Sequence, residues 1–233
     1  MQECVKRWQD EGKSPSTINS RLSALETTGV KVEGCWVKNK LPPKWWLRPD
    51  ESSRLLAYLR ATPALFPTAP LLADHIEFVA YTGLRVEEAL RLTWRDVTLR
   101  VIKVDGVLRS QSEMTVPGTK TRRSHATLAL GDMPSLILLK RKKEAGDNPL
   151  VFPIKYDNLH ESWDKARAFL GEQDNPMASL KALRRTAARH LTTSGMPTEM
   201  VRDYLRDSNI KTNMGYLHLV GGYSVNERRR WLS

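Results

Sequence analysis

Apolar residues recur at helical spacing through most of the chain. In residues 13–28, Ile18, Leu22 and Leu25 fall on one helical stripe, and Ser14 followed by Pro15 is typical of a helix start. Similar patterns predict further helices at about 48–59, 71–81, 84–94, 132–144, 157–170, 179–194, 198–206, 209–217 and 223–231.

Between residues 96 and 130 the pattern changes to that of β-strands. Asp105-Gly106 is a hairpin signal between β-prone residues, and Pro117-Gly118 begins a second turn between arms that carry Val116 and Leu128. The chain is therefore predicted to be mainly α with a small antiparallel β-sheet of about three strands, an α+β fold.

Two parts are predicted along the chain. Glycines and the pair Pro42-Pro43 interrupt residues 29–47, so residues 1–47 are interpreted as a helical segment and linker, and residues 48–233 as the main domain. A compact helical domain needs three or four helices, and about one and a half are predicted in the first part. We expect this part to be truncated, or to be completed by a segment that is not present.

The net charge restricts the kind of partner. The chain has 37 Lys and Arg against 26 Asp and Glu, a net charge of +11. Such an excess indicates a polyanion, with nucleic acid the first candidate and an anionic membrane surface the second. The longest apolar run, residues 136–139, is too short to span a bilayer, so no membrane partner is expected.

The cysteines and the first residues indicate the compartment. Cys4 and Cys35 form neither a disulfide framework nor a metal site, and the start of the chain lacks the apolar stretch of a signal peptide. A cytoplasmic protein is therefore expected.

Basic residues at three places could bind phosphate. Arg85 lies at a helix start after Gly83, where an anion is favoured, and Glu88 could orient it or cap the helix; an ordinary surface ion pair is the alternative. Lys120, Arg122 and Arg123 form a basic finger at the tip of the predicted second hairpin, with a solvated charged turn as the alternative.

The third place is the helix predicted at 179–194. Lys181 and Arg184 are three residues apart and share one helical face. Arg185 and Arg189 add charge to the same helix. Tyr216 follows it, and a tyrosine among cations could attack a phosphate, although most tyrosines pack in cores.

The order of these motifs resembles the tyrosine recombinases, the integrases of phages and mobile elements. The resemblance runs over about residues 48–220 through TGLRVEEALRLTWRDV, TKTRRSHATLAL, LKALRRTAARHLTTSGM and VRDYLRDSNIKTNMGYLH. In addition, KSPSTINSRLSAL resembles part of the family's helical core-binding domain.

The resemblance implies a role for each residue at a motif position. Arg85 and Arg184 correspond to the two catalytic arginines, and Lys120 to the lysine that protonates the leaving 5′ hydroxyl. Lys181 stands where the family has histidine or lysine, and Tyr216 corresponds to the nucleophile that forms a 3′-phosphotyrosyl link. DNA contacts are further expected from Lys13, Arg21, Arg122, Arg123, Arg185 and Arg189. No cofactor or metal is implied.

Two positions depart from the family pattern, Lys181 in place of the usual histidine, which is the milder change, and Asp207. The usual LGH reads Leu205-Arg206-Asp207, so a carboxylate stands where histidine or tryptophan is usual. An ionised aspartate cannot donate a hydrogen bond and repels phosphate unless a cation such as Arg206, Arg184 or Arg202 pairs with it. We expect Asp207 to belong to the catalytic set and to make cleavage slower than in a member with the usual residue.

The resemblance implies a site-specific recombinase that cleaves and rejoins double-stranded attachment sites for integration or excision of a phage or mobile element. The same resemblance implies a homotetramer on DNA, accessory DNA-bending or directionality factors, and association with the bacterial nucleoid. Two alternatives remain open: a degenerate member that binds DNA without cleaving it, and a type IB topoisomerase-like enzyme that relaxes DNA.

Overall fold

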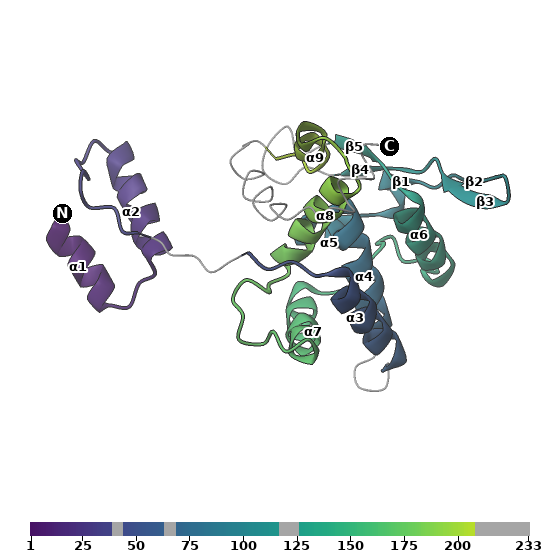
Figure 1. Cartoon of the computed structure of the whole chain (residues 1–233), viewed down its shortest axis with the longest axis horizontal. Coiled ribbons are helices and arrows are strands. Elements are labelled where there is room, and N and C mark those ends of the chain that lie inside the picture. The colour runs from purple at the N-terminus through teal and green to yellow at the C-terminus, as the bar shows by residue number, and fades with distance from the viewer. Residues whose placement is uncertain (39–43, 63–68, 117–125, 208–233) are drawn as a thin grey trace, which may run out of the picture. The chain divides into compact units, whose positions relative to one another are not determined.

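The computed structural model describes residues 1–38, 44–62, 69–116 and 126–207. The chain divides into two compact units, Met1–Pro43 and Lys44–Ser233 (Figure 1). The helices predicted at 209–217 and 223–231 lie outside the described residues. None of the helices in the described part of the chain combines the length and apolar character that a bilayer crossing needs.

The first unit is built from α1 (Gln2–Asp10) and α2 (Pro15–Thr27). The Ser14 hydroxyl caps α2 by accepting a hydrogen bond of 3.2 Å from the Thr17 N–H, as the sequence predicts. The α1 helix is not among the predicted helices, because few of its residues are apolar and Val5 alone is buried. The small core of this unit consists of Val5, Ile18, Leu22, Val32 and Cys35.

The second unit holds the remaining described helices. These are α3 (Pro49–Ala61), α4 (Ala69–Thr82), α5 (Val86–Arg91), the 3₁₀ turn η1 (Trp94–Asp96), α6 (Asp132–Glu144), α7 (Tyr156–Phe169), α8 (Lys181–Thr193) and α9 (Thr198–Tyr204).

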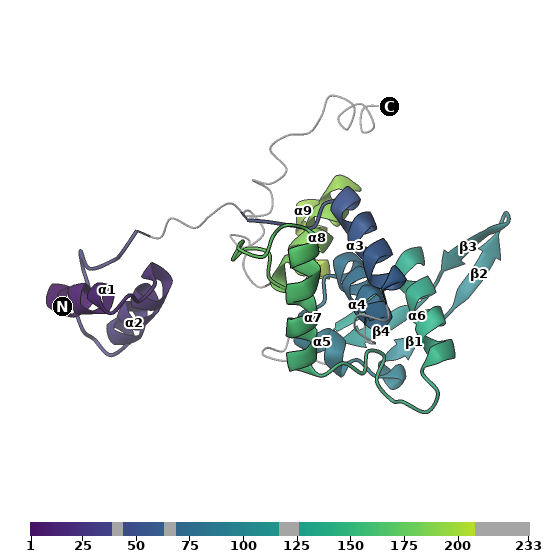
Figure 2. The ribbon, with the colours of Figure 1, turned by 90° about the horizontal axis from the view of Figure 1, so that it is seen from below.

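Its strands form two antiparallel sheets. They are β1 (Val97–Thr98), β2 (Val101–Val104), β3 (Val107–Ser110), β4 (Glu113–Val116) and β5 (Ala126–Ala129). The three-stranded sheet has the order β1-β4-β5, and β2 and β3 form a separate hairpin around Asp105-Gly106 that extends away from the helices (Figures 1 and 2). The predicted fold class, mainly helical with a small antiparallel sheet, is confirmed. The hairpin predicted at Asp105-Gly106 is present, but it forms a sheet of its own, apart from the three-stranded sheet.

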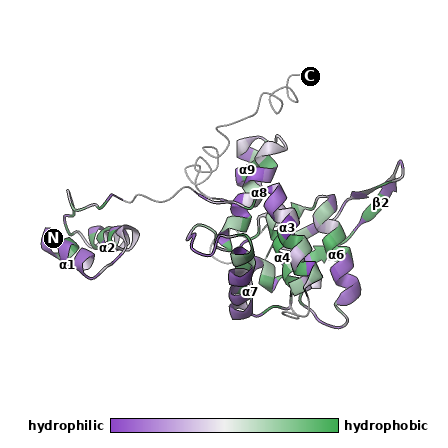
Figure 3. Ribbon diagram, turned by 60° about the horizontal axis from the view of Figure 1, so that its bottom comes forward, coloured by the Kyte–Doolittle hydropathy of each residue, from purple (hydrophilic) through white to green (hydrophobic). Residues whose placement is uncertain are grey.

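Helix α4 lies at the centre of the second unit and packs against α3, α5, α6, α7 and α8. It carries mostly hydrophobic residues (Figure 3), and even its polar Asp74 and His75 are buried. Asp74 is neutralised by Lys140 Nζ at 2.9 Å and by Arg60 Nη2 at 3.6 Å. Because most of α4 is buried among these helices, it fixes where the loop that follows it begins.

His75 has no such compensation. It is fully buried with its ring edge-on to Phe152 at 5.4 Å, and neither ring nitrogen has a partner among the described residues. Burial lowers the pKa of His75 from 6.5 to about 4, because the charged imidazolium loses its hydration.

We predict that this histidine makes the fold sensitive to acid. The folded state keeps His75 neutral, so its contribution is complete above the unfolded pKa of 6.5 and is lost as the pH falls toward about 4, by up to about 3 kcal/mol. Denaturant unfolding of the wild type and of His75→Leu at pH 7 and pH 4.5 measures this. An equal loss of stability in both proteins at pH 4.5 would contradict the prediction.

Gly83 follows the last residue of α4, and α8 and the end of α9 pack closely against this glycine. Its φ of +63° is left-handed, and a Cβ on Gly83 would overlap the Leu205 side chain and lie 3.2 Å from the Ala187 Cβ. The absence of a side chain at this position therefore lets the end of α9 pack against the end of α4.

We predict that Gly83→Ala is more destabilising than the same change at an open glycine. Strain and overlap together should cost about 2 kcal/mol or more. Gly171→Ala is the matched control, since Gly171 also has a positive φ, +76°, but open space around it. This change should cost only the strain of a left-handed alanine, about 1 kcal/mol. Thermal unfolding compares the two, and equal losses would show that Leu205 does not limit the position.

Candidate functional site

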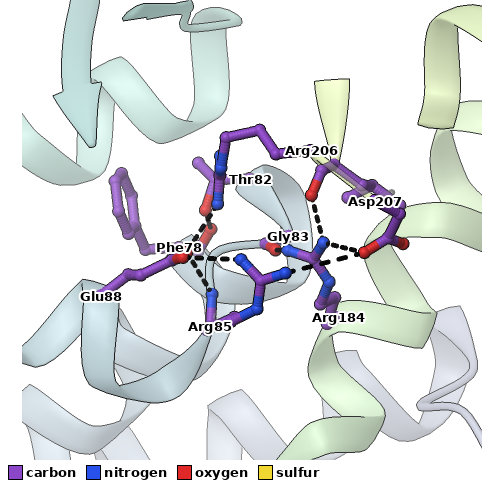
Figure 4. Close-up of polar contacts among 9 residues, drawn as sticks. Phe78, Thr82, Gly83, Arg85, Glu88, Arg184, Arg206 and Asp207 are labelled. Carbon is purple, nitrogen blue, oxygen red and sulfur yellow. Dashed lines mark hydrogen bonds and ion pairs between the residues drawn. The ribbon is translucent and has the colours of Figure 1, made fainter. Parts of the chain in front are cut away.

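The candidate site forms where three segments of the second unit meet: the turn after α4, helix α8 and the end of α9 (Figure 4). Arg85 is the N-cap of α5, and its N–H donates to Glu88 Oε2 at 2.9 Å. Arg85 Nη1 donates to Glu88 Oε1 at 2.8 Å. Glu88 thus both caps the helix and orients Arg85, the two roles that the sequence suggested.

Arg184 joins all three segments. Its Nη1 donates to the Gly83 carbonyl at 2.5 Å, and its Nη2 donates to the Leu205 carbonyl and, at 2.6 Å, to Asp207 Oδ1. The side chain is only 11% exposed. These bonds fix the guanidinium at one position, with the last turn of α9 on one side and the end of α4 on the other.

Asp207 lies between the two predicted catalytic arginines. Its Oδ1 is 2.6 Å from Arg184 Nη2 and 3.9 Å from Arg85 Nη2. The negative charge of Asp207 is therefore balanced by two cations, Arg184 and, at a longer distance, Arg85. Arg202 pairs instead with Asp203. The other carboxylate oxygen of Asp207 is buried and has no hydrogen-bond partner among the described residues.

Arg206 was considered from the sequence only as a possible partner of Asp207, and in the structure it pairs with Glu88 instead. Its Nη2 donates to Glu88 Oε2 at 2.5 Å, and its side chain is 2% exposed. Burial lowers the pKa of Arg206, while Glu88 acts in the opposite direction. The departure from the family motif at this position was the available signal, but nothing in the sequence indicates that this arginine turns inward.

The remaining residues that were predicted to act in catalysis or DNA binding lie outside this network of arginines and carboxylates. Lys181 is exposed at the first residue of α8 and is outside the ion-pair network of the described residues. Lys13 is exposed in the first unit, where the Arg21 guanidinium lies 5.1 Å from the Trp8 ring centroid. The predicted residues Lys120, Arg122, Arg123 and Tyr216 lie outside the described residues.

Arg185 and Arg189 contact the segment that leads into α3. Arg185 Nε donates to the Trp45 carbonyl at 2.7 Å, and a second nitrogen donates to the Met177 carbonyl. The Arg189 guanidinium lies 5.5 Å from the Trp46 ring centroid. These two arginines, expected to contact DNA, thus have partners within the protein and hold Trp45 and Trp46 against α8.

The site as a whole suits a singly charged anion. Three guanidinium groups alternate with two carboxylates in the order Arg206, Glu88, Arg85, Asp207 and Arg184, which leaves one net positive charge. Planar guanidinium groups match the geometry of phosphate oxygens. Among the described residues, no group of three or more His, Cys, Asp or Glu side chains could hold a metal ion.

Known structures resemble the chain at low sequence identity. The Tn1549 transposon integrase in complex with transposon right end DNA has a TM-score of 0.69 at 16% identity over 99% of this chain and 82% of its own. A lambda integrase dimer bound to a COC′ core site has a TM-score of 0.60 at 17% identity and covers 91% of this chain and 61% of its own. The XerH recombinase bound to palindromic difH substrate has a TM-score of 0.59 at 18% identity and covers 76% of this chain and 50% of its own.

These likenesses concern the fold. A search of curated proteins finds no match. The phage integrase family model, however, matches residues 45–221, nearly the stretch over which the motifs resemble the tyrosine recombinases. The family prediction is confirmed: this chain belongs to the phage integrase family of tyrosine recombinases.

Proposed function

We propose that this protein is a site-specific recombinase that cleaves and rejoins duplex DNA through a 3′-phosphotyrosyl intermediate. The observation that supports this most directly is the convergence of the Arg85 and Arg184 guanidinium groups on one oxygen, Asp207 Oδ1. A carboxylate oxygen and a non-bridging phosphate oxygen are both anionic acceptors. Arg184 donates a hydrogen bond to this oxygen and Arg85 Nη2 lies 3.9 Å from it, so the two arginines can together hold the scissile phosphate.

Each residue has a distinct role in the proposed reaction. Arg85 and Arg184 stabilise the charge that develops on the phosphoryl oxygens. The phenolate oxygen of Tyr216 attacks phosphorus, forming a P–O bond while the bond to the 5′ oxygen breaks, and Lys120 gives that oxygen its proton. Lys181, three residues before Arg184 on α8, adds a further cation. Rejoining reverses these steps with the 5′ hydroxyl of a partner strand, so the bond energy is conserved.

The DNA partner is supported by charge and by similar proteins. The net charge of +11 favours a polyanion, and the Tn1549 integrase, XerH and lambda integrase structures all contain DNA. We further propose that the protein acts as a homotetramer on paired attachment sites, with accessory DNA-bending or directionality factors, and that residues 1–47 form part of a core-binding domain. Integration or excision of a phage or mobile element is the biological role that fits this activity.

Covalent trapping tests the proposal. Duplexes that the protein binds are first selected from a randomised pool and then nicked close to the cleavage site. After cleavage, the short fragment beyond the nick diffuses away, so rejoining is prevented and the covalent intermediate accumulates. We predict a protein–DNA adduct that survives denaturation, maps to Tyr216 by mass spectrometry, and is absent in Tyr216→Phe. The same variant should keep its DNA affinity, which serves as the control for folding.

The possible outcomes separate the alternatives. A lack of adduct on DNA that the protein demonstrably binds would contradict cleavage and favour a degenerate member that only binds DNA. An adduct at Tyr216 with plasmid relaxation but without strand exchange between two duplexes would favour a topoisomerase-like enzyme.

A further inference from the structure

Arg206 occupies its position at an energetic cost. It has a φ of +57°, and apart from Asp105 it is the only described non-glycine residue in the left-handed region. Its guanidinium is buried, and Nε and Nη1 have no hydrogen-bond partner among the described residues. A glycine would fit this turn without strain, so the stability of the turn alone does not account for an arginine.

The turn that carries Arg206 is held firmly at the end of α9. The Arg206 N–H donates to the Asp203 carbonyl at 3.0 Å, and the Asp207 N–H to the Arg202 carbonyl at 3.1 Å. The neighbouring Leu205 carbonyl accepts from Arg184. With its backbone fixed in this way, the Arg206 side chain points inward to Glu88 while the next side chain, Asp207, points to Arg184 (Figure 4).

Glu88 is the acceptor that links Arg206 to Arg85. One of its oxygens accepts from Arg85 Nη1, and the other accepts from the Arg85 N–H and from Arg206 Nη2. Glu88 is fully buried, so its charge is poorly screened by water. Without Arg206, Arg85 would be the cation that balances this carboxylate, and less of its positive charge would act on a ligand.

The charge of the site depends on the same residue. Arg85 and Arg184 alone would be balanced by Glu88 and Asp207, and Arg206 supplies the third positive charge. A phosphodiester carries one negative charge. With Arg206 the site has the net charge that this ligand would neutralise; without Arg206 the site is neutral.

We propose that Arg206 is a positioning residue of the phosphate site: it holds and neutralises Glu88, so that Arg85 stays oriented toward the phosphate with its charge available. This inference rests on the proposed function, because it assumes that Arg85 and Arg184 receive a phosphate. Arg206 itself acts through Glu88 and, being buried, does not contact DNA.

Phosphate binding by the folded protein tests this role. Inorganic phosphate is titrated into the full chain while the NMR signals of arginine side chains in the folded state are followed, so a smaller folded population does not change the measured affinity. We expect Arg206→Met to bind phosphate about tenfold more weakly or worse, and Arg206→Lys, which keeps the charge, to stay within about threefold of the wild type. Arg202→Met is the matched control, because it removes an arginine from α9 that pairs with Asp203 and should bind like the wild type.

The variant Arg206→Met leaves Glu88 with one cation fewer and risks unfolding. The double variant Glu88→Gln, Arg206→Met removes both charges, so no buried carboxylate is left without its cation. It keeps the net charge of the site, so it should bind phosphate more tightly than Arg206→Met and more weakly than the wild type, in which Glu88 orients Arg85.

Failure of this inference differs from failure of the proposed function. If the wild type binds phosphate and Arg206→Met, folded, binds it equally well, Arg206 has no positioning role. Equal weakening in Arg206→Lys and Arg206→Met would also overturn it, because the charge would not matter. If the wild type shows no response of its arginine signals to phosphate, the phosphate site itself is wrong.

Discussion

The candidate site depends on one guanidinium group. Arg184 donates to the Gly83 carbonyl, the Leu205 carbonyl and Asp207 Oδ1, and so binds the end of α4, the end of α9 and helix α8 together. Two of these acceptors are backbone carbonyls at helix ends, which have no partner within their own helices. The interaction therefore satisfies these two buried carbonyls and places a cation beside Arg85 at the same time.

The rest of the second unit makes this junction possible. The buried helix α4 positions Gly83, whose lack of a side chain lets Leu205 pack closely. The segment around Trp45 is bound to α8 by Arg185, and the Leu47 N–H donates to the Thr186 hydroxyl at 2.9 Å. The arginines of α8 thus serve two purposes. Arg185 binds the segment around Trp45 to this helix, and Arg184 forms the candidate site.

Local patterns predicted most of the helices, the hairpin at Asp105-Gly106 and the pairing of Arg85 with Glu88, because each depends on residues close in sequence. The partners of Asp207 were predicted only as a choice among three arginines, and Arg85 was not among them. That choice depends on which way side chains turn at the end of α9, and the left-handed Arg206 sends its own side chain to Glu88 and that of Asp207 to Arg184. Contacts across 118 residues of sequence, such as Arg206 with Glu88, leave no local pattern.

In the proposed site, Asp207 Oδ1 occupies the place of a phosphate oxygen between Arg85 and Arg184. The most direct measurement compares the affinity of the wild type and of Asp207→Asn for inorganic phosphate. Asparagine keeps an oxygen that accepts from Arg184 but removes the negative charge, so we expect phosphate to bind roughly tenfold more tightly to the variant. An affinity equal to or below that of the wild type would contradict the claim, since it would mean that the carboxylate does not compete with phosphate for the two arginines.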